Sequence, residues 1–297
     1  MNDSRLKSGL LLIAFLLSPP AAYAAGDIEK ELLGCWQRVE KPDEMMRFEK
    51  TRFINVGKTY QQIMPVIYEG RRVFTNINGQ KEEFELTLQD GMLTVKNEVV
   101  EKYKRLNHIP PELDFSPLPL GQPKPVSAAK VKAIQDELAR RAAEDQAVRT
   151  DPAKQENMAA VDAENTKYLR ELAQELGWID AKRFGRDAST HAFLIVQHSG
   201  DLRLMQAALP EIEKDLKTGI GDPQNYALLH DRLKLKLGER QRYGTQIGVN
   251  ENGESVVLPL EDKSKVEQFR KAIGLFPLAQ YLAIYKQQSG KEVKFAD

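Results

Sequence analysis

A proline-rich stretch between residues 107 and 126 constrains this 297-residue chain more than any other feature. Six of the fifteen prolines fall there: Pro110, Pro111, Pro117, Pro119, Pro123 and Pro125. Proline has no backbone N–H and a fixed φ, so such a stretch is extended and semi-rigid rather than helical or central in a sheet. We therefore interpret residues 107–126 as a linker between two domains, at 27–106 and 127–297.

The first of these domains has the two-residue hydrophobic period of β-strands. Apolar Phe84, Leu86 and Leu88 alternate with polar Glu85, Thr87 and Gln89. Tight-turn signals lie at Glu69-Gly70, Asn78-Gly79 and Asp90-Gly91. Short strands separated by such turns predict a small antiparallel β-barrel.

Two short motifs at the ends of this region resemble the lipocalin-like barrels. They are Gly34-Cys35-Trp36 and Tyr103-Lys104-Arg105. In those barrels a Gly-x-Trp motif starts the first strand and a late basic residue packs over the tryptophan. The resemblance implies a cation–π contact between Trp36 and Arg105 that closes one end of the barrel. A barrel of this class can hold one small apolar ligand, but with so few residues we expect a filled interior.

The second domain is predicted to be all-α with one extended excursion. We expect helices at 127–149, 159–176, 187–198, 201–218, 223–238, 266–273 and 277–288, and extended chain at 239–260. Pro210 lies within the fourth of these helices and should bend or split it. Asp145 and Arg149 are four residues apart on the first helix, and we interpret them as a surface ion pair.

The N-terminus has the three parts of a signal peptide. Arg5 and Lys7 precede an apolar run at 9–17, and Ala22-Tyr23-Ala24 follows as a cleavage pattern. Nine apolar residues are too few to cross a bilayer, which takes about 20. We therefore predict cleavage after Ala24, a periplasmic or secreted protein, and no integral membrane segment after cleavage.

Charge and cysteine content exclude further classes. Lys plus Arg and Asp plus Glu balance at 43 each, which gives no electrostatic reason to expect nucleic acid or an anionic membrane as partner. Cys35 is the single cysteine, so no intramolecular disulfide is possible, and we interpret it as a small buried hydrophobe.

A series of motifs in the second half is similar to a bacterial family. The motifs are Glu144-Asp145-Gln146-Ala147-Val148-Arg149, Gly177-Trp178, Gln197-His198, Asp231-Arg232, Gln241, Tyr243-Gly244-Thr245-Gln246 and Gly274-Leu275. In order and spacing they resemble the domain-of-unknown-function family 6624. The resemblance implies a helical domain and no activity that can be carried over. Ile179 departs from the pattern, because the family usually has proline after Gly-Trp.

Polar residues at the ends of apolar segments in this domain form a candidate site, because a core needs none of them. The candidate ligand-binding residues are Gln197, His198, Asp231, Arg232, Gln241, Tyr243, Thr245 and Gln246. The first two end an apolar helix, the next two lie on a later helix, and the last four belong to the extended excursion. Three interpretations of this set remain open.

The first interpretation is binding. In extended chain Gln241, Tyr243 and Thr245 point one way, and Arg242 and Gln246 the other. Amide, hydroxyl and phenol groups suit a neutral ligand such as a glycan or peptide of the cell envelope. They do not form a phosphate cradle, which would need a glycine-rich loop at a helix N-terminus. A cell-envelope binding or interaction protein is the favoured function.

The second interpretation is a hydrolase, with water activated by His198 or Asp231 as catalytic base. No serine or cysteine in the motifs is an obvious nucleophile. His191, His198, His230 and Asp201 could in principle ligate zinc, but no pair of histidines has the i, i+4 spacing of a helical metal clamp. We expect no metal and no cofactor.

The third interpretation is structural. Gln197 and His198 would then cap their helix by bonding its last carbonyls. Asp231 and Arg232 would pair with Arg149, with Asp145 or with the backbone of the excursion. Burial and mutual hydrogen bonds distinguish such a network from an accessible site.

Overall fold

The computed structural model describes residues 28–58, 60–77, 80–96, 100–250 and 252–295. The predicted signal peptide at 1–24 and the predicted turn at Asn78-Gly79 lie outside the described residues. The chain divides into two compact units, one ending at Asp114 and the other starting at Phe115.

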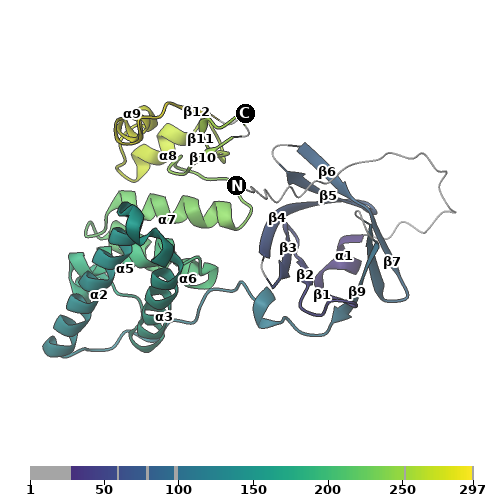
Figure 1. Ribbon diagram of the computed structural model, residues 1–297, viewed down its shortest axis with the longest axis horizontal. Coiled ribbons are helices and arrows are strands. Elements are labelled where there is room, and N and C mark those ends of the chain that lie inside the picture. The colour runs from purple at the N-terminus through teal and green to yellow at the C-terminus, as the bar shows by residue number, and fades with distance from the viewer. Residues whose placement is uncertain (1–27, 59, 78–79, 97–99, 251, 296–297) are drawn as a thin grey trace. The chain divides into compact units, whose positions relative to one another are not determined.

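The first unit is a nearly closed antiparallel β-barrel (Figure 1). Its elements are α1 (Ile28–Leu32), β1 (Gly34–Arg38), β2 (Met45–Phe48), β3 (Arg52–Gly57), β4 (Tyr60–Glu69), β5 (Arg72–Ile77), β6 (Gln80–Phe84), β7 (Leu86–Gln89), β8 (Met92–Lys96), β9 (Val100–Leu106) and the 3-10 helix η1 (Pro111–Leu113). The strand order is β6-β5-β4-β3-β2-β1-β9-β8-β7. The two strands at the ends of this order are consecutive in the chain, with Glu85 alone between them. This continuity brings the ends of the sheet together.

The hairpin turns follow from local sequence. Asp90 and Gly91 have φ values of 52° and 74°, the positive pair that a two-residue hairpin of type I′ requires. They join β7 to β8, in which Gln89 pairs with Met92. Gly70, with φ of 63°, lies in the turn between β4 and β5. Both predicted turns within the described residues are confirmed.

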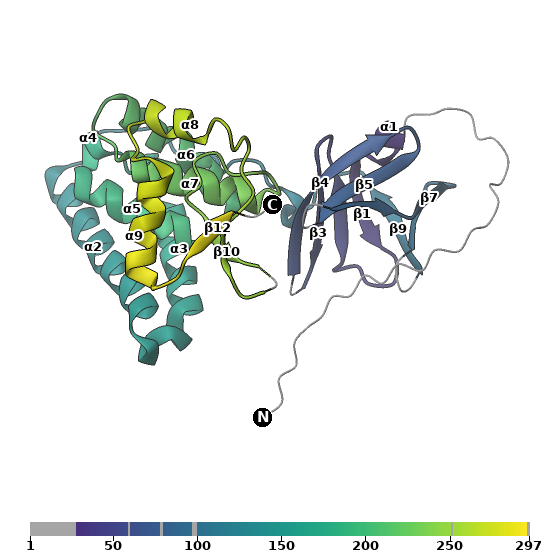
Figure 2. The same ribbon diagram turned by 90° about the horizontal axis from the view of Figure 1, so that it is seen from above.

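The interior of the barrel is filled by side chains, and α1 packs against this core at one end of the barrel (Figures 1 and 2). Its core consists of Ile28, Leu32, Trp36, Met46, Phe48, Phe53, Val66, Val73, Leu93, Val95 and Tyr103. The expectation of a filled interior is therefore confirmed.

Arg105 joins α1 to the barrel wall. Its guanidinium lies 4.3 Å from the centre of the Trp36 ring, so the predicted cation–π contact is confirmed. The same group donates to the carbonyl of Leu33 at 2.7 Å and to that of Glu31. Trp36 Nε1 donates to the carbonyl of Leu32 at 2.9 Å. Trp36 and Arg105, one from each of the two sequence motifs, thus bond the free carbonyls at the end of α1.

The second unit is mainly helical (Figures 1 and 2). Its elements are α2 (Ala128–Thr150), η2 (Pro152–Asn157), α3 (Met158–Leu176), α4 (Ala181–Phe184), α5 (Arg186–His198), α6 (Leu202–Lys217), α7 (Pro223–Lys236), β10 (Ile247–Val249), β11 (Ser255–Val257), α8 (Val266–Ala272), α9 (Leu278–Ser289) and β12 (Val293–Phe295). Helix α5 contacts α2, α3, α4, α6 and α7 and is the central helix of the unit.

The helix boundaries agree with the capping signals. Ser127 Oγ accepts from the Lys130 N–H at the start of α2, and an Asp222 oxygen accepts from the Gln224 N–H at the start of α7. All seven predicted helices are present. Helix α6 continues through Pro210 without being split. Its buried apolar face packs against α7, and we interpret this packing as outweighing the free energy of the one backbone hydrogen bond that proline cannot donate.

Two small features of this unit were not predicted. Strand β12 pairs with β11 in parallel, which makes a three-stranded sheet in the order β10-β11-β12. The four-residue helix α4 follows Asp180, whose side chain caps it. Segments of three or four residues are too short for a hydrophobic period to be read from them.

The proline-rich stretch is extended but not free. Arg47 donates to the carbonyl of Leu113 at 3.0 Å in the first unit. In the second unit Gln206 donates to the carbonyl of Phe115 at 2.5 Å, and the Leu118 N–H donates to the carbonyl of Arg203 at 2.9 Å. Among the helices that the structure describes, none has the length and apolar character needed to cross a membrane.

Candidate functional site

Asp231 on α7 organises the loop that follows this helix. Its side chain is fully buried, and its carboxylate accepts from the backbone N–H groups of Arg242 at 2.9 Å, Tyr243 at 3.1 Å and Thr245 at 3.0 Å. The Thr245 hydroxyl donates to the same carboxylate at 3.0 Å, and His230 Nδ1 lies 3.1 Å from it. Every lone pair that a carboxylate offers is therefore occupied from within the domain.

Gln241 fastens the two ends of the same loop. Its buried amide donates to the carbonyls of Gln246 at 2.9 Å and Leu258 at 2.7 Å, and accepts from the Gln246 N–H at 2.9 Å. The side chain thus replaces a backbone group in a sheet-like ladder. Gln246 itself makes weaker contacts, at 3.5 Å to the carbonyl of Leu228 and at 3.2 Å to Thr245 Oγ1.

The remaining polar groups of the loop are also satisfied. Arg270 on α8 is buried and donates to the carbonyl of Tyr243 at 2.6 Å, while Tyr281 on α9 donates to the carbonyl of Thr245 at 2.9 Å. Burial lowers the pKa of Arg270. Gly244 has φ of 70°, and a Cβ there would lie 3.0 Å from Leu278, so the tight turn against α9 requires glycine.

The predicted alternation in this loop is confirmed. Gln241, Tyr243 and Thr245 are buried, whereas Arg242 and Gln246 are partly exposed. The three residues point into the domain, however, and their polar groups serve the loop. Asp231 bonds the backbone of the excursion, as the structural interpretation expected. This half of the candidate set forms a closed network, which we call the loop network.

His198, at the end of α5, has a different environment. Its Nδ1 lies 3.0 and 2.9 Å from the two carboxylate oxygens of Asp145 on α2, whose side chain is 1% exposed. Because a carboxylate accepts, Nδ1 carries the proton and Nε2 of the neutral ring is an acceptor. Nε2 has no hydrogen-bond partner among the described residues, and the side chain is 16% exposed.

Asp145 is the residue that sequence reasoning underestimated. It does not form a surface ion pair with Arg149, because it is buried and bonds His198, Gln146 and Arg149 together. Arg149 lies 3.0 Å from Asp145 and 2.7 Å from Asp162 on α3. A signal was present: Asp145 continues the apolar stripe of α2 after Leu138 and Ala142, which is where a carboxylate is costly unless it has partners.

Two further residues of the candidate set, Arg232 and Gln197, make no side-chain hydrogen bond within the described residues. Arg232 is partly buried, and neither it nor Gln197 has a hydrogen-bond partner among the described residues. Burial lowers the pKa of Arg232, and so does the charge of Arg149. Lys236, one turn further along α7, has its pKa lowered by burial and by Arg232. We call His198, Asp145, Arg149, Arg232 and Lys236 the basic cluster.

The histidines do not gather in one place. His198 bonds Asp145, His230 bonds Asp231, and His191 Nδ1 is buried without a partner in the described part of the chain. The described part of the chain contains no group of three or more His, Cys, Asp or Glu side chains that could hold a metal ion. Neither Gln197 nor His198 bonds the last carbonyls of α5, where Ser199 Oγ bonds the carbonyl of Val196 instead.

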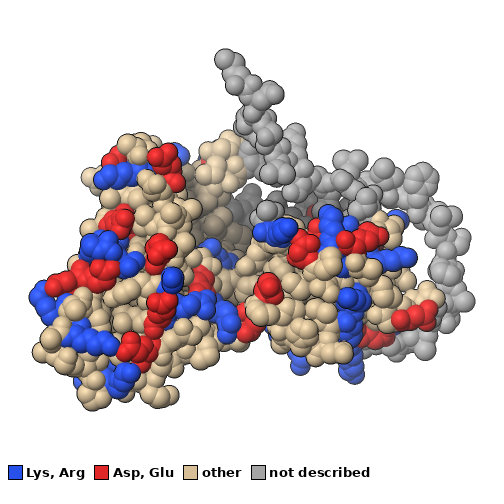
Figure 3. Space-filling model, turned by 60° about the horizontal axis from the view of Figure 1, so that its bottom comes forward, with Lys and Arg blue, Asp and Glu red and all other residues tan. Residues whose placement is uncertain are grey.

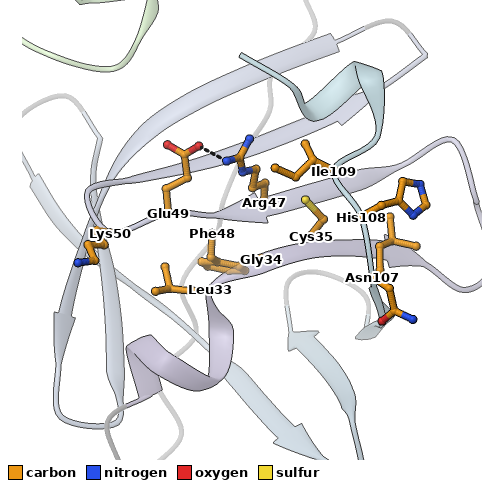
Figure 4. A pocket seen from close by; sticks show the side chains of 11 residues that line it. Leu33, Gly34, Cys35, Arg47, Phe48, Glu49, Lys50, Asn107, His108 and Ile109 are labelled. Atoms are coloured by element: carbon orange, nitrogen blue, oxygen red, sulfur yellow. Dashed lines mark ion pairs between the residues drawn. The ribbon is translucent and has the colours of Figure 1, made fainter. Parts of the chain in front are cut away.

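The barrel unit has a pocket of about 520 Å³ beside Cys35 (Figure 4). Arg47, in its wall, pairs with Glu49 at 3.0 Å, and the thiol of Cys35 has its pKa raised by burial. Cys35 is 2% exposed, in agreement with the interpretation as a buried hydrophobe. The charge of this arginine is compensated, in contrast to that of Arg232.

The fold and these contacts define the class of the protein: a small β-barrel followed by a helical domain. In the helical domain the polar groups of the loop network bond one another, whereas Arg232 and Lys236 of the basic cluster have no carboxylate partner among the described residues. The sequence model of the family described as "Family of unknown function (DUF6624)" matches residues 127–294. The chain therefore belongs to this family, and the match covers the helical domain. Comparison with curated proteins and with solved structures gives no match.

Proposed function

We propose that this protein is exported and binds a ligand of the cell envelope through the partly exposed side of its helical domain, at His198 and Arg232. The loop network does not contact the ligand in this proposal. Its residues position helices α7, α8 and α9; they are Asp231, Gln241, Tyr243, Thr245 and Gln246.

The observation that carries the proposal is the unused ring nitrogen of His198. A buried carboxylate fixes the ring through Nδ1, while Nε2 has no partner among the described residues. Nε2 is not among the buried side-chain atoms that lack a partner in the described part of the chain, so it is accessible to a ligand. Helix α5, which ends at His198, contacts α7, which carries Arg232. Arg149 bonds the same Asp145 as His198, and its charge lowers the pKa of Arg232.

Binding is tested by replacing His198 with asparagine. The amide nitrogen of asparagine can take the place of Nδ1 beside Asp145, so the fold is preserved while Nε2 is lost. The probe is a soluble digest of peptidoglycan, followed through the imidazole ¹⁵N resonances of the four histidines. We expect the His198 signal to shift and binding to be lost in His198→Asn. Binding that persists in this variant contradicts the proposal.

The matched control is His108→Asn. His108 is exposed and lies in the barrel unit. Its replacement should leave both the binding of the digest and the melting temperature unchanged.

Export is supported by the signal-peptide pattern at 1–24. We expect cell fractionation to find the protein in the periplasm or the medium, with a mature N-terminus at Ala25 by mass spectrometry. An uncleaved chain in the cytoplasmic fraction contradicts this part of the proposal.

The second candidate function is hydrolysis, and the His198–Asp145 pair favours it. A histidine oriented by a buried carboxylate is suited to remove a proton from water at Nε2. Asp231, the other base considered, has its oxygens occupied by the loop network. If the function is hydrolytic, new cleavage products appear in the same digest, and His198→Asn slows their formation by about 100-fold or more.

A further inference from the structure

Within the described residues, the carboxylates near the basic cluster serve only one of its cations. The charge of Arg149 acts on Arg232, and that of Arg232 acts on Lys236, an exposed lysine one turn further along α7. The carboxylates of Asp145 and Asp162 lie beside Arg149. Both carboxylates bond Arg149, so Arg232 and Lys236 are left without a carboxylate partner among the described residues.

The arrangement of Arg232 is unfavourable for the folded protein alone. Its Nε is buried and unbonded within the described part of the chain. Arg232 and Lys236 are four positions apart on the same helix, a spacing at which like charges repel. A partly desolvated cation without a counter-charge costs free energy. Nearby Lys234 differs, since it pairs with Glu239 at 2.5 Å.

We propose that the ligand of this site carries an anionic oxygen group, a carboxylate or a phosphate, which Arg232 binds and His198 contacts. The inference rests on the proposed binding function and specifies the chemistry of the ligand. Arginine is suited to such groups because its planar guanidinium donates two parallel hydrogen bonds to them.

The neutral ligand that the sequence favoured fits this site less well. That expectation relied on the amide, phenol and hydroxyl groups of Gln241, Tyr243 and Thr245, and all three side chains are buried. The Gln241 amide and the Thr245 hydroxyl form their hydrogen bonds within the loop network. Among the described residues of the candidate set, the groups without partners are the Arg232 guanidinium, the Nε2 of His198 and the amide of Gln197. The charge of the guanidinium favours an anion over an uncharged sugar.

The experiment compares two sugars that differ by one lactyl ether group, which carries a carboxylate. N-acetylmuramic acid carries a lactyl carboxylate that N-acetylglucosamine lacks, and inorganic phosphate serves as the third probe. Each is titrated into the full-length protein at constant ionic strength, with the His198 imidazole signal and the melting temperature as readouts. We expect the acid sugar, phosphate or both to shift the His198 signal and raise the melting temperature, and the neutral sugar to do neither.

Arg232→Gln is the decisive variant, and Lys234→Gln on the same helix is its control. Loss of a charge-assisted pair should weaken anion binding at least about tenfold in Arg232→Gln. Its melting temperature without anion should be unchanged or raised, because an uncompensated cation has been removed. A large drop would assign Arg232 to the scaffold and overturn the inference. Lys234→Gln should bind like the wild type.

The other outcomes separate the two proposals. Equal binding of both sugars, retained in Arg232→Gln, overturns the anion inference and leaves the binding function standing. If neither anion shifts the His198 signal but the peptidoglycan digest still does, the anion inference alone fails. If neither the digest nor any probe shifts it, both proposals fail.

Discussion

Asp231 and Asp145 are both buried aspartates beside a histidine, and they differ in what else surrounds them. The first accepts three backbone N–H groups and a hydroxyl, all from one loop. The second accepts from side chains alone, on its own helix and on α5. A carboxylate bonded mainly by backbone N–H groups fixes a loop, whereas one bonded by side chains alone orients those side chains, here the partly exposed His198.

Asp231→Asn tests the loop network. The amide group of asparagine would present N–H groups to backbone N–H groups, leaving buried donors unbonded. We expect a loss of stability on the order of 3 kcal/mol. For a domain of this size the melting temperature should fall by roughly 6–12 °C. Asp222→Asn is the control, because asparagine caps a helix as well as aspartate does. An unaltered melting temperature in Asp231→Asn would contradict the described network.

Gln241 and Gln246 form a matched pair for a second prediction. Gln241→Ala removes three hydrogen bonds of 2.7–2.9 Å and leaves the Leu258 carbonyl and the Gln246 N–H without these partners, while the Gln246 carbonyl still accepts from the Leu258 N–H. Its cost should be about 3 kcal/mol. Gln246→Ala removes only contacts of 3.5 and 3.2 Å and should cost about 1 kcal/mol or less. Chemical denaturation of the two variants measures both values, and equal losses would contradict the assignment.

At the scale of elements, the sequence predicted the helix starts and turns that residues close in the chain determine. Caps such as Ser127 and Asp222 located helix starts, and Asp90-Gly91 located a hairpin. Strand β12 was missed because its three residues gain their conformation from pairing with β11, which precedes them by many residues. Propensity within a window of sequence carries no information on such pairing.

The candidate site shows the same limit. A two-residue period correctly grouped Gln241, Tyr243 and Thr245 on one face, but it cannot say whether that face meets solvent or the core. Arg270 was overlooked because a charged residue on a short amphipathic helix is usually exposed, and here it is 1% exposed. Only the tertiary contacts of α8 with the loop explain its burial.

Asp215 on α6 provides a pH-dependent prediction at the junction with α4. It accepts from the Ala181 N–H at 2.9 Å, and burial raises its pKa above the ordinary 3.8. The folded protein therefore binds this proton more tightly than the unfolded chain. Stability from this group decreases as the pH rises from 3.8 through the folded pKa, and is unaffected well below 3.8.

Asp215→Asn removes this titration and retains an oxygen for Ala181. We expect its melting temperature, relative to that of the wild type, to be higher at pH 7 than at pH 4. Measuring both proteins across this range by circular dichroism tests the sign. A relative melting temperature that falls as the pH rises would show that the charged form of Asp215 is the favoured one.

At the scale of the whole molecule, charge is distributed in both signs. On the face that Figure 3 presents, acidic and basic side chains are interspersed. This agrees with the balance of 43 basic and 43 acidic residues. Arg232 and Lys236, which have no carboxylate partner among the described residues, are a local feature that an overall count cannot reveal.

Each unit has its own core, which predicts separate unfolding transitions. The barrel core includes Trp36 and Leu93, and a core of the second unit includes Val257 and Leu278. Because the cores share no residues, a substitution in one unit should destabilise that unit alone. Differential scanning calorimetry should accordingly resolve two transitions.

Arg105→Met and Asp231→Asn assign these transitions. Arg105→Met removes the cation over Trp36 and the bonds to the end of α1, a loss of about 1–2 kcal/mol at this exposed position. It should lower one transition and leave the other in place, whereas Asp231→Asn should do the reverse. Lys104→Met, on the same strand and also exposed, controls for loss of surface charge. If either variant lowers both transitions together, the two units unfold as one cooperative body.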